Sequence, residues 1–366
     1  MKAPVLLSSE IIRDIPPENG NPRNSEGDFA LLKDGRILFA YSRYHGGDCS
    51  DGAPCDIGGM ISSDGGKTFE PLPYLLACAS DHGVSNIMSV SLCRLKNGTL
   101  CLFYLAKYPP LSCMFLRRAT GDETAFGPAE VCVPLEAEVY YVINNSRVCM
   151  LPDGRLILPM AVHKLAHCEN GWSAGTYFGS AKMFVGDPDG KNWKLLSHEI
   201  SMPYPGHSTT GLQEPGVEVL PDGRLYAYFR TDRGFHYESI SSDGGASWTA
   251  PTQSPFTGPD SPLVIRRNPF DGWYYAVWNP IPKYNGRDLT SAGWGRTPLV
   301  LAVSRDGAEY SPCAVIEDRP DCGYCYPAIR FTGKNQMLLS YCAGGPEDGA
   351  CLNRTRIRAI RVELPE

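Results

Sequence analysis

The apolar residues of this chain fall in short runs that are joined by turns. Windows with helical spacing are scarce, because Pro or Gly interrupts most of them. The commonest pattern is an apolar residue, one or two residues, Asp-Gly or Asn-Gly, and a new apolar run. It predicts a β-hairpin, since these dipeptides tolerate the positive φ of a tight turn. Clear copies occupy Leu32–Ile37, Leu95–Leu100, Leu151–Leu156 and Leu220–Leu225, and looser copies occupy Pro269–Tyr274 and Phe331–Leu338.

The six hairpins divide the chain into units of similar size. Counted between the turn glycines, they are 63, 56, 69, 49 and 61 residues apart. Each unit has room for four strands, and a four-stranded antiparallel sheet that is repeated radially is the blade of a β-propeller. We therefore expect an all-β, six-bladed β-propeller. A length of 366 residues by itself predicts two or three domains, but the repeats predict that residues 1–366 form one.

A second motif recurs four times along the chain, further from the hairpin in its unit. Ser62–Phe69 has the sequence Ser-Ser-Asp-Gly-Gly-Lys-Thr-Phe, and Ser241–Trp248 is a close copy. Degraded copies begin at Asp187 and Ser304. In such a turn the Asp side chain accepts backbone N–H groups and Gly supplies the positive φ. The motif is therefore predicted to be structural, and no catalytic role is expected for its Asp residues.

Composition narrows the class of protein. Gly and Pro together make 69 of 366 residues, and hydrophobic residues make 43%, which excludes disorder, collagen and coiled coil. The net charge of −6 leaves no basic footprint, so a nucleic-acid partner is not expected. No apolar run approaches the roughly 20 residues that span a bilayer, so no membrane partner is expected. The N-terminus has no signal-peptide pattern. The expected location is the cytoplasm, or outside it if a signal has been removed.

The 14 cysteines are numerous, and most lie in apolar runs where a thiol acts as a small buried hydrophobe. Cys322 and Cys325 form a single C-x-x-C without a second pair, so neither a metal nor another cofactor is predicted. Cys49 and Cys55 could form a disulfide only in an oxidising compartment.

The box S-x-D-G-G-x-[ST]-[FW], present twice in a chain of six units, resembles the Asp-box of the sialidase (neuraminidase) superfamily, whose members are BNR-repeat propellers. The resemblance covers residues 23–341. It implies a retaining exo-α-sialidase that acts on glycans with a terminal acidic sugar. Three arginines would hold the sugar carboxylate, a Tyr would be the nucleophile, a Glu would take its proton and an Asp would be the general acid.

The segment Gln213–Arg230 matches the superfamily best, with Glu-Pro, a strand, an Asp-Gly turn, a second strand and an Arg. The match implies that Glu214 is the base and Arg230 a clamp residue. Arg296, before an apolar run that leads into a degraded box, matches another clamp Arg. Tyr326 matches the nucleophile, and Tyr324 stays open as the alternative because it would share the same strand face.

Arg23 matches the first clamp Arg by its place before the first hairpin, although its surrounding motif departs from the family. In the loop after the second strand, Asp51 matches the acid, with Asp48 as the alternative. Arg43 matches a further pocket Arg. The segment 140–148 occupies the same place in its unit as Glu214 does, so its Asn145 and Arg147 are predicted to contact sugar hydroxyls.

His163 and His207 are weaker candidates for the same pocket. Two other functions stay open. One is a glycosidase for a different acidic sugar, such as a uronic acid, which the departures around residues 21–29 and 144–147 motivate. The other is a carbohydrate-binding propeller without catalysis, for which Asp-boxes alone would suffice. Oligomeric state is not predicted.

Overall fold

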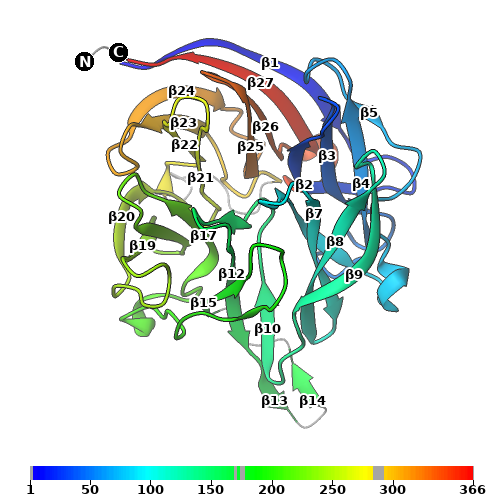
Figure 1. Ribbon diagram of the computed structural model, residues 1–366, viewed down its shortest axis with the longest axis vertical. Coiled ribbons are helices and arrows are strands. Elements are labelled where there is room, and N and C mark those ends of the chain that lie inside the picture. Colours follow the sequence, from blue (N-terminus) through cyan, green and yellow to red (C-terminus); the bar gives the residue numbers. More distant parts are fainter. Residues whose placement is uncertain (1–2, 169–170, 174–177, 283–291, 366) are drawn as a thin grey trace.

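Six antiparallel β-sheets are arranged in a ring in the computed structural model of the chain (Figure 1). The structure describes residues 3–168, 171–173, 178–282 and 292–365. No α-helix occurs in these ranges. Each of these sheets is a four-stranded blade, with a fifth short strand in blade 3 and with β1 (Val5–Ile15), from the N-terminus, as the fourth strand of blade 6. The predicted all-β, six-bladed β-propeller is therefore confirmed.

The strands follow chain order within the blades. Blade 1 consists of β2 (Arg23–Leu31), β3 (Ile37–Tyr44), β4 (Cys55–Ser62) and β5 (Glu70–Pro71). Blade 2 consists of β6 (Ile87–Arg94), β7 (Leu100–Tyr108), β8 (Leu111–Thr120) and β9 (Ala125–Val133). Blade 3 consists of β10 (Val139–Val142), β11 (Cys149–Met150), β12 (Leu156–Lys164), β15 (Gly179–Gly186) and β16 (Lys194–Leu195).

Blade 4 consists of β17 (Gln213–Val219), β18 (Leu225–Arg230), β19 (Phe235–Ser241) and β20 (Thr252–Thr257). Blade 5 consists of β21 (Val264–Arg267), β22 (Tyr274–Trp278), β23 (Leu299–Ser304) and β24 (Ser311–Glu317). Blade 6 consists of β25 (Cys325–Gly333), β26 (Gln336–Cys342), β27 (Thr355–Glu363) and β1 (Val5–Ile15). The remaining elements are the hairpin β13 (Ala166–Cys168) and β14 (Gly171–Ser173) and the 3₁₀ turns η1 (Ala79–His82), η2 (Pro205–His207) and η4 (Pro346–Asp348).

The two ends of the chain close the ring in blade 6. β1 lies antiparallel to β27, from Val5 opposite Glu363 to Ile15 opposite Thr355, and the two strands lie side by side in Figure 1. Hydrophobic clusters fill the spaces between neighbouring blades, as where Leu38 and Leu102 share one cluster between blades 1 and 2. Such a closed ring leaves few unpaired strand edges. None of the helical turns among the described residues has the length and apolar composition to cross a membrane.

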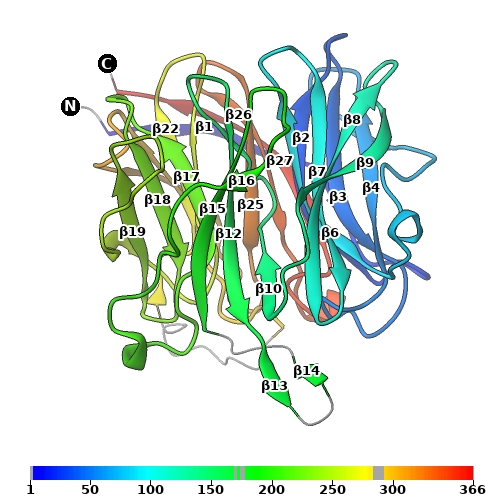
Figure 2. The same cartoon turned by 60° about the horizontal axis from the view of Figure 1, so that its bottom comes forward.

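Four of the inner strands carry a β-bulge near their first residues. Register shifts fall in β2, β6, β17 and β25, two to three residues into each strand. In three of them a residue has positive φ there: Ser89 at 63°, Glu214 at 46° and Tyr326 at 55°. Bulges re-aim side chains and gather next to active sites. All four lie where the inner strands begin, at one mouth of the central channel, which Figure 2 shows from the side.

Candidate active site

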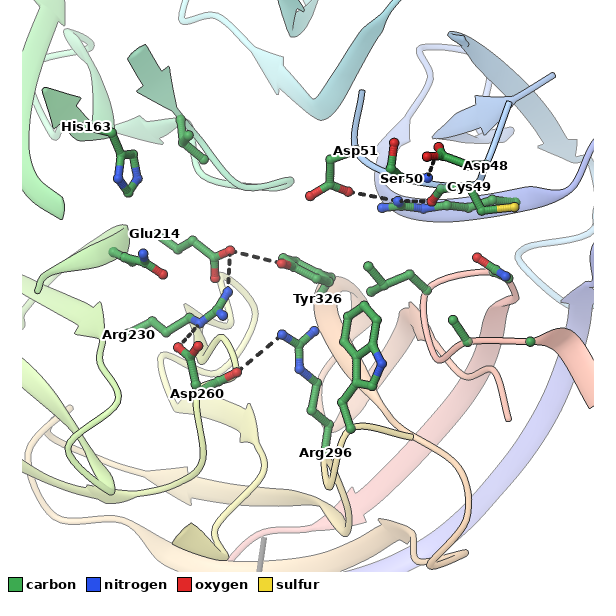
Figure 3. A pocket seen from close by; sticks show the side chains of 18 of the residues that line it. Asp48, Cys49, Ser50, Asp51, His163, Glu214, Arg230, Asp260, Arg296 and Tyr326 are labelled. Carbon is green, nitrogen blue, oxygen red and sulfur yellow. Dashed lines mark hydrogen bonds and ion pairs between the residues drawn. The ribbon is translucent and has the colours of Figure 1, made fainter. Parts of the chain in front are cut away.

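A cavity of about 930 Å³ opens at this mouth of the channel (Figure 3). Its walls come from the starts of inner strands and from the loops beside them, and the bulged residues Glu214 and Tyr326 are part of its lining. The charged side chains that line it are Arg23, Asp48, Asp51, Glu214, Arg230, Asp260 and Arg296. Three cations and four acids thus meet in one hollow, although they are far apart in the sequence.

Tyr326 and Glu214 form a direct pair across the channel. The Tyr326 hydroxyl donates to Glu214 Oε1 at 3.0 Å (Figure 3). Desolvation, followed by the charge of Glu214, holds the pKa of Tyr326 well above its usual value, and two nearby arginines only partly offset this. The phenol is therefore neutral in the resting protein. Its one hydrogen-bonded acceptor is the carboxylate that could take its proton.

Tyr324 does not share the position of Tyr326. It is 2% exposed and packs in a hydrophobic cluster of blades 5 and 6, with its ring 6.3 Å from that of Tyr341. The bulge between Cys325 and Ala328 interrupts the two-residue alternation, so residues 324 and 326 do not face the same way. This corrects the expectation that Tyr324 lies on the cavity face.

Glu214 is held on three sides. Arg230 Nη1 donates to Glu214 Oε1 at 2.7 Å, and Asn144 Nδ2 donates to Oε2 at 3.4 Å. The opposite edge of Arg230 is fixed by Asp260, which accepts from Nε. Neither Asn144 nor Asp260 is among the site residues predicted from the sequence. Asn144 adjoins the predicted Asn145, but Asp260 lies in a turn without any motif.

Arg296 lies beside Arg230 and faces the nucleophile. Its Nη2 donates to the backbone oxygen of Asp260 at 3.3 Å, and its guanidinium stands 5.7 Å from the centre of the Tyr326 ring. The indole of Trp294 covers another side at 5.1 Å. Asp260 therefore positions both arginines, one through its carboxylate and one through its backbone.

Arg23 lies on the far side of the cavity, against the loop that carries the predicted acid. Its Nη1 is 2.8 Å from Asp51 Oδ1, and it also donates to the Cys49 oxygen at 2.9 Å. The guanidinium rests on the Tyr44 ring at 4.3 Å. The Arg23 side chain is 3% exposed, whereas that of Asp51 is 64% exposed. Asp51 thus covers Arg23 from the cavity.

The charge state of Asp51 follows from these neighbours. Desolvation raises its pKa, but the positive charges of Arg23 and Lys107 outweigh this and leave the pKa below its usual value. Lys107 Nζ also donates to the Asp51 backbone oxygen, and Asn86 donates to it at 3.1 Å. Asp48 lines the same wall and is tied locally, accepting from the Ser50 amide at 3.0 Å.

Two further predicted side chains, Asn145 and Arg147, do not line the cavity. Asn145 is buried beneath it and donates to the Gly27 oxygen at 2.7 Å and to the Tyr326 oxygen at 3.2 Å. Arg147 is buried too, and donates to the Tyr228 hydroxyl at 3.0 Å. Both are neighbours of Ser146, which has a positive φ of 53°. They support the inner strands, which corrects the expectation that they contact sugar hydroxyls.

Arg43 and the two histidines complete the account of the predictions. Arg43 lies on β3, paired with Asn24 on one neighbouring strand and with Asp56 on the other. It does not line the cavity, which corrects the expectation that it is a pocket residue. His163 does line the cavity. His207, in η2, does not line it, and its ring lies 6.1 Å from that of Tyr204.

Comparisons with solved structures agree with this fold. A protein of unknown function from Dyadobacter fermentans is 18% identical with a TM-score of 0.70, covering 98% of this chain and 100% of that one. The Hadza microbial sialidase Hz136 is 14% identical with a TM-score of 0.70, covering 93% and 66%. The intramolecular trans-sialidase from Ruminococcus gnavus, in complex with oseltamivir carboxylate, is 13% identical with a TM-score of 0.68, covering 98% and 97%. These likenesses show a sialidase-like fold.

Comparisons of the sequence itself give the family. No curated protein matches the chain. The family model described as BNR repeat-like domain matches residues 91–337, about two thirds of the chain, from the second blade into the sixth. The chain belongs to the BNR repeat-like domain family.

Proposed function

We propose that the protein is a retaining exo-α-sialidase, which releases a terminal sialic acid from a glycan. The observation that supports this best is the 3.0 Å contact of the Tyr326 hydroxyl with Glu214, beside the guanidinium groups of Arg230 and Arg296. A neutral phenol is a nucleophile that a substrate carboxylate does not repel. Planar guanidinium groups are the donors that bind a carboxylate best.

The reaction proceeds in two displacements. Arg230 and Arg296 bind the sugar carboxylate, which places the anomeric carbon over Tyr326. Glu214 takes the phenolic proton as Tyr326 Oη attacks that carbon, and Asp51 gives a proton to the departing glycosidic oxygen. In the second step Asp51 takes a proton from water, the water oxygen attacks the anomeric carbon, and Tyr326 leaves with its proton returned from Glu214. Two inversions give net retention of configuration.

The pair of Arg23 and Asp51 adds a condition to the first step. While Asp51 is bound to Arg23 its pKa is low, and it holds no proton to give. A substrate carboxylate that binds Arg23 would replace Asp51 as its partner and shield it from water. The pKa of Asp51 would then rise, because its closest positive charge is neutralised and desolvation dominates. Binding of an acidic sugar would in this way produce the general acid.

A uronic acid glycosidase is the second candidate. It is favoured by the cover over Arg23, whose side chain is 3% exposed. With Arg23 paired to Asp51, Arg230 and Arg296 are the lining guanidinium groups that lie beside Glu214 and Tyr326. Two guanidinium groups suffice for the carboxylate of a uronic acid, which is not attached to the anomeric carbon.

Fluorogenic substrates test both candidates. We expect release from a 4-methylumbelliferyl α-sialoside, and a loss of at least about 10³-fold in Tyr326→Phe, because the nucleophile is gone. Tyr324→Phe is the matched control and should keep its rate, since Tyr324 lies outside the cavity. Release from a uronide alone would favour the second candidate. No release from either would favour a binding propeller, and full activity of Tyr326→Phe would refute the mechanism.

A further inference from the structure

Directly behind the arginine clamp lies a cluster of thiols that the proposed mechanism does not use. Cys325, Cys342 and Cys351 are each 0% exposed and pack together with Leu352. The rings of Trp294 and Tyr326 pack against the same cluster. The described residues hold no group of three or more His, Cys, Asp or Glu side chains placed to bind a metal ion. The cluster therefore points to thiol chemistry.

Cys325 and Cys342 occupy positions that suit a disulfide. They lie opposite each other on the antiparallel strands β25 and β26, beside the bulge that re-aims Tyr326. Opposite residues of such strands point to one face with Cα atoms about 4.5–5.5 Å apart. A disulfide requires Cα atoms about 4.4–6.8 Å apart. The strand pairing thus places the two Cα atoms in the range that a disulfide requires, and both thiols are free.

Cys325 differs from the other buried thiols in its partners. Arg296 Nη1 donates to Cys325 Sγ at 3.3 Å. Desolvation raises the pKa of Cys325, but hydrogen bonds from the thiols of Cys342 and Cys351, together with the Arg296 charge, leave it well below its usual value. Cys113, which lacks such partners, has a pKa raised by desolvation to about 11. These partners favour the thiolate form of Cys325, which is the reactive form of a cysteine.

The cluster is close to solvent although it is buried. Arg296, Trp294, Tyr326 and Leu352 contact it, and the same four side chains line the cavity. A single layer of side chains therefore separates the thiols from the water in the cavity. An oxidant the size of a water molecule needs only a small movement of this layer to reach Cys325.

We propose that Cys325 and Cys342 are a redox-sensitive pair that a hydroperoxide oxidises to a disulfide. The Cys325 thiolate attacks one oxygen of hydrogen peroxide, the O–O bond breaks, and hydroxide leaves, which makes a sulfenic acid. The Cys342 sulfur then attacks the Cys325 sulfur, its proton leaves with the hydroxyl group as water, and the S–S bond forms. In total two thiols are oxidised and one peroxide is reduced to two waters.

A disulfide between Cys325 and Cys342 would change the hydrogen bonding of Arg296, one of the arginines proposed to bind the sugar carboxylate. A disulfide sulfur carries no negative charge, so Arg296 would lose its charged acceptor at Cys325. This consequence rests on the proposed function, because it concerns the binding of an acidic sugar. We expect KM to rise by about tenfold, the cost of one charge-assisted hydrogen bond, and dithiothreitol to restore it.

Peptide mapping of the folded, full-length protein tests the pair. Reduced protein treated with hydrogen peroxide should yield a peptide that joins Cys325 to Cys342, with the loss of two hydrogens. Cys342→Ser should not form it, and Cys351→Ser is the matched control that should. Absence of the joined peptide from folded wild-type protein, or a bond from Cys325 to Cys351 instead, would overturn the proposal.

The two readouts keep the two proposals separate. The joined peptide is measured by mass alone and does not need a substrate. If the protein hydrolyses neither sialoside nor uronide, the mapping still decides the thiol pair. If it hydrolyses a sialoside but forms no joined peptide, only the thiol pair is refuted.

Discussion

The two faces of the propeller use acidic residues in opposite ways. On the face of the Asp-boxes, Asp243 Oδ1 accepts from the Ser247 amide at 2.9 Å and from the Ser241 hydroxyl at 2.8 Å. Asp64 makes the same contacts with Ser62 and Thr68. At the channel mouth Glu214 instead binds Tyr326, which is 112 residues away in the sequence. The Asp-box carboxylates are satisfied within their own turns, whereas Glu214 is satisfied by side chains of other blade segments.

The difference separates structural from chemical roles. A carboxylate whose hydrogen-bond donors all belong to its own turn is held in place by that turn, and its oxygens are already occupied. The partners of Glu214 and Asp51 are themselves side chains that a substrate can engage: Tyr326, Arg230 and Arg23. Substitutions at the channel mouth should therefore change the reaction rate, and substitutions in the Asp-boxes should change stability.

The largest expected effect is at Glu214. In Glu214→Gln the amide cannot accept the phenolic proton, so kcat should fall by about 10²–10⁴-fold. The melting temperature should change little, because the amide keeps a hydrogen-bonding oxygen for Arg230. Fluorogenic hydrolysis and thermal unfolding measure the two quantities. A kcat within a factor of a few of wild type would show that Glu214 is not the base.

A smaller effect is expected at Lys107, which acts on Asp51 by its charge. The proposed acid must be protonated in the substrate complex, so kcat falls as pH rises through the pKa that Asp51 has there. Lys107 helps to hold that pKa low, so Lys107→Met should raise it and move the basic limb of the pH profile to higher pH. Lys107→Arg keeps the charge and should keep the limb. An unmoved limb in Lys107→Met would remove Asp51 from the acid role.

The smallest effect is expected on the opposite face. Asp243→Ala should lower the melting temperature by a few degrees while kcat stays unchanged, because Asp243 binds only its own turn. Hydrogen bonds from Ser247 lower the pKa of Asp243 to about 2. Its stabilisation is thus present above the ordinary Asp value and is lost as pH falls through about 2. The gap in melting temperature between variant and wild type should narrow on acidification. A loss of kcat would contradict the separation of the two faces.

The turns could be predicted because their contacts join residues that are close in the sequence. The Asp-Gly hairpins and the Asp-boxes are made by contacts within a few residues, and turns such as Gly35, Gly98 and Gly154 have the positive φ that their sequences require. The last hairpin is a partial exception. Its positive φ is at Asn335, so the turn lies two residues after the predicted Gly333.

The sequence by itself determined the six units and their turns, because local hydrogen bonds and strand alternation depend on neighbours in the chain. Glu214, Arg230, Arg296 and Tyr326 are candidates through their match to the sialidase superfamily. Only the tertiary structure decided that Tyr326 rather than Tyr324 faces the cavity, since a bulge breaks the alternation there. It also brought in Asp260 and Lys107 and set Cys325 opposite Cys342. Those contacts join distant segments, and they exist only once the ring has closed.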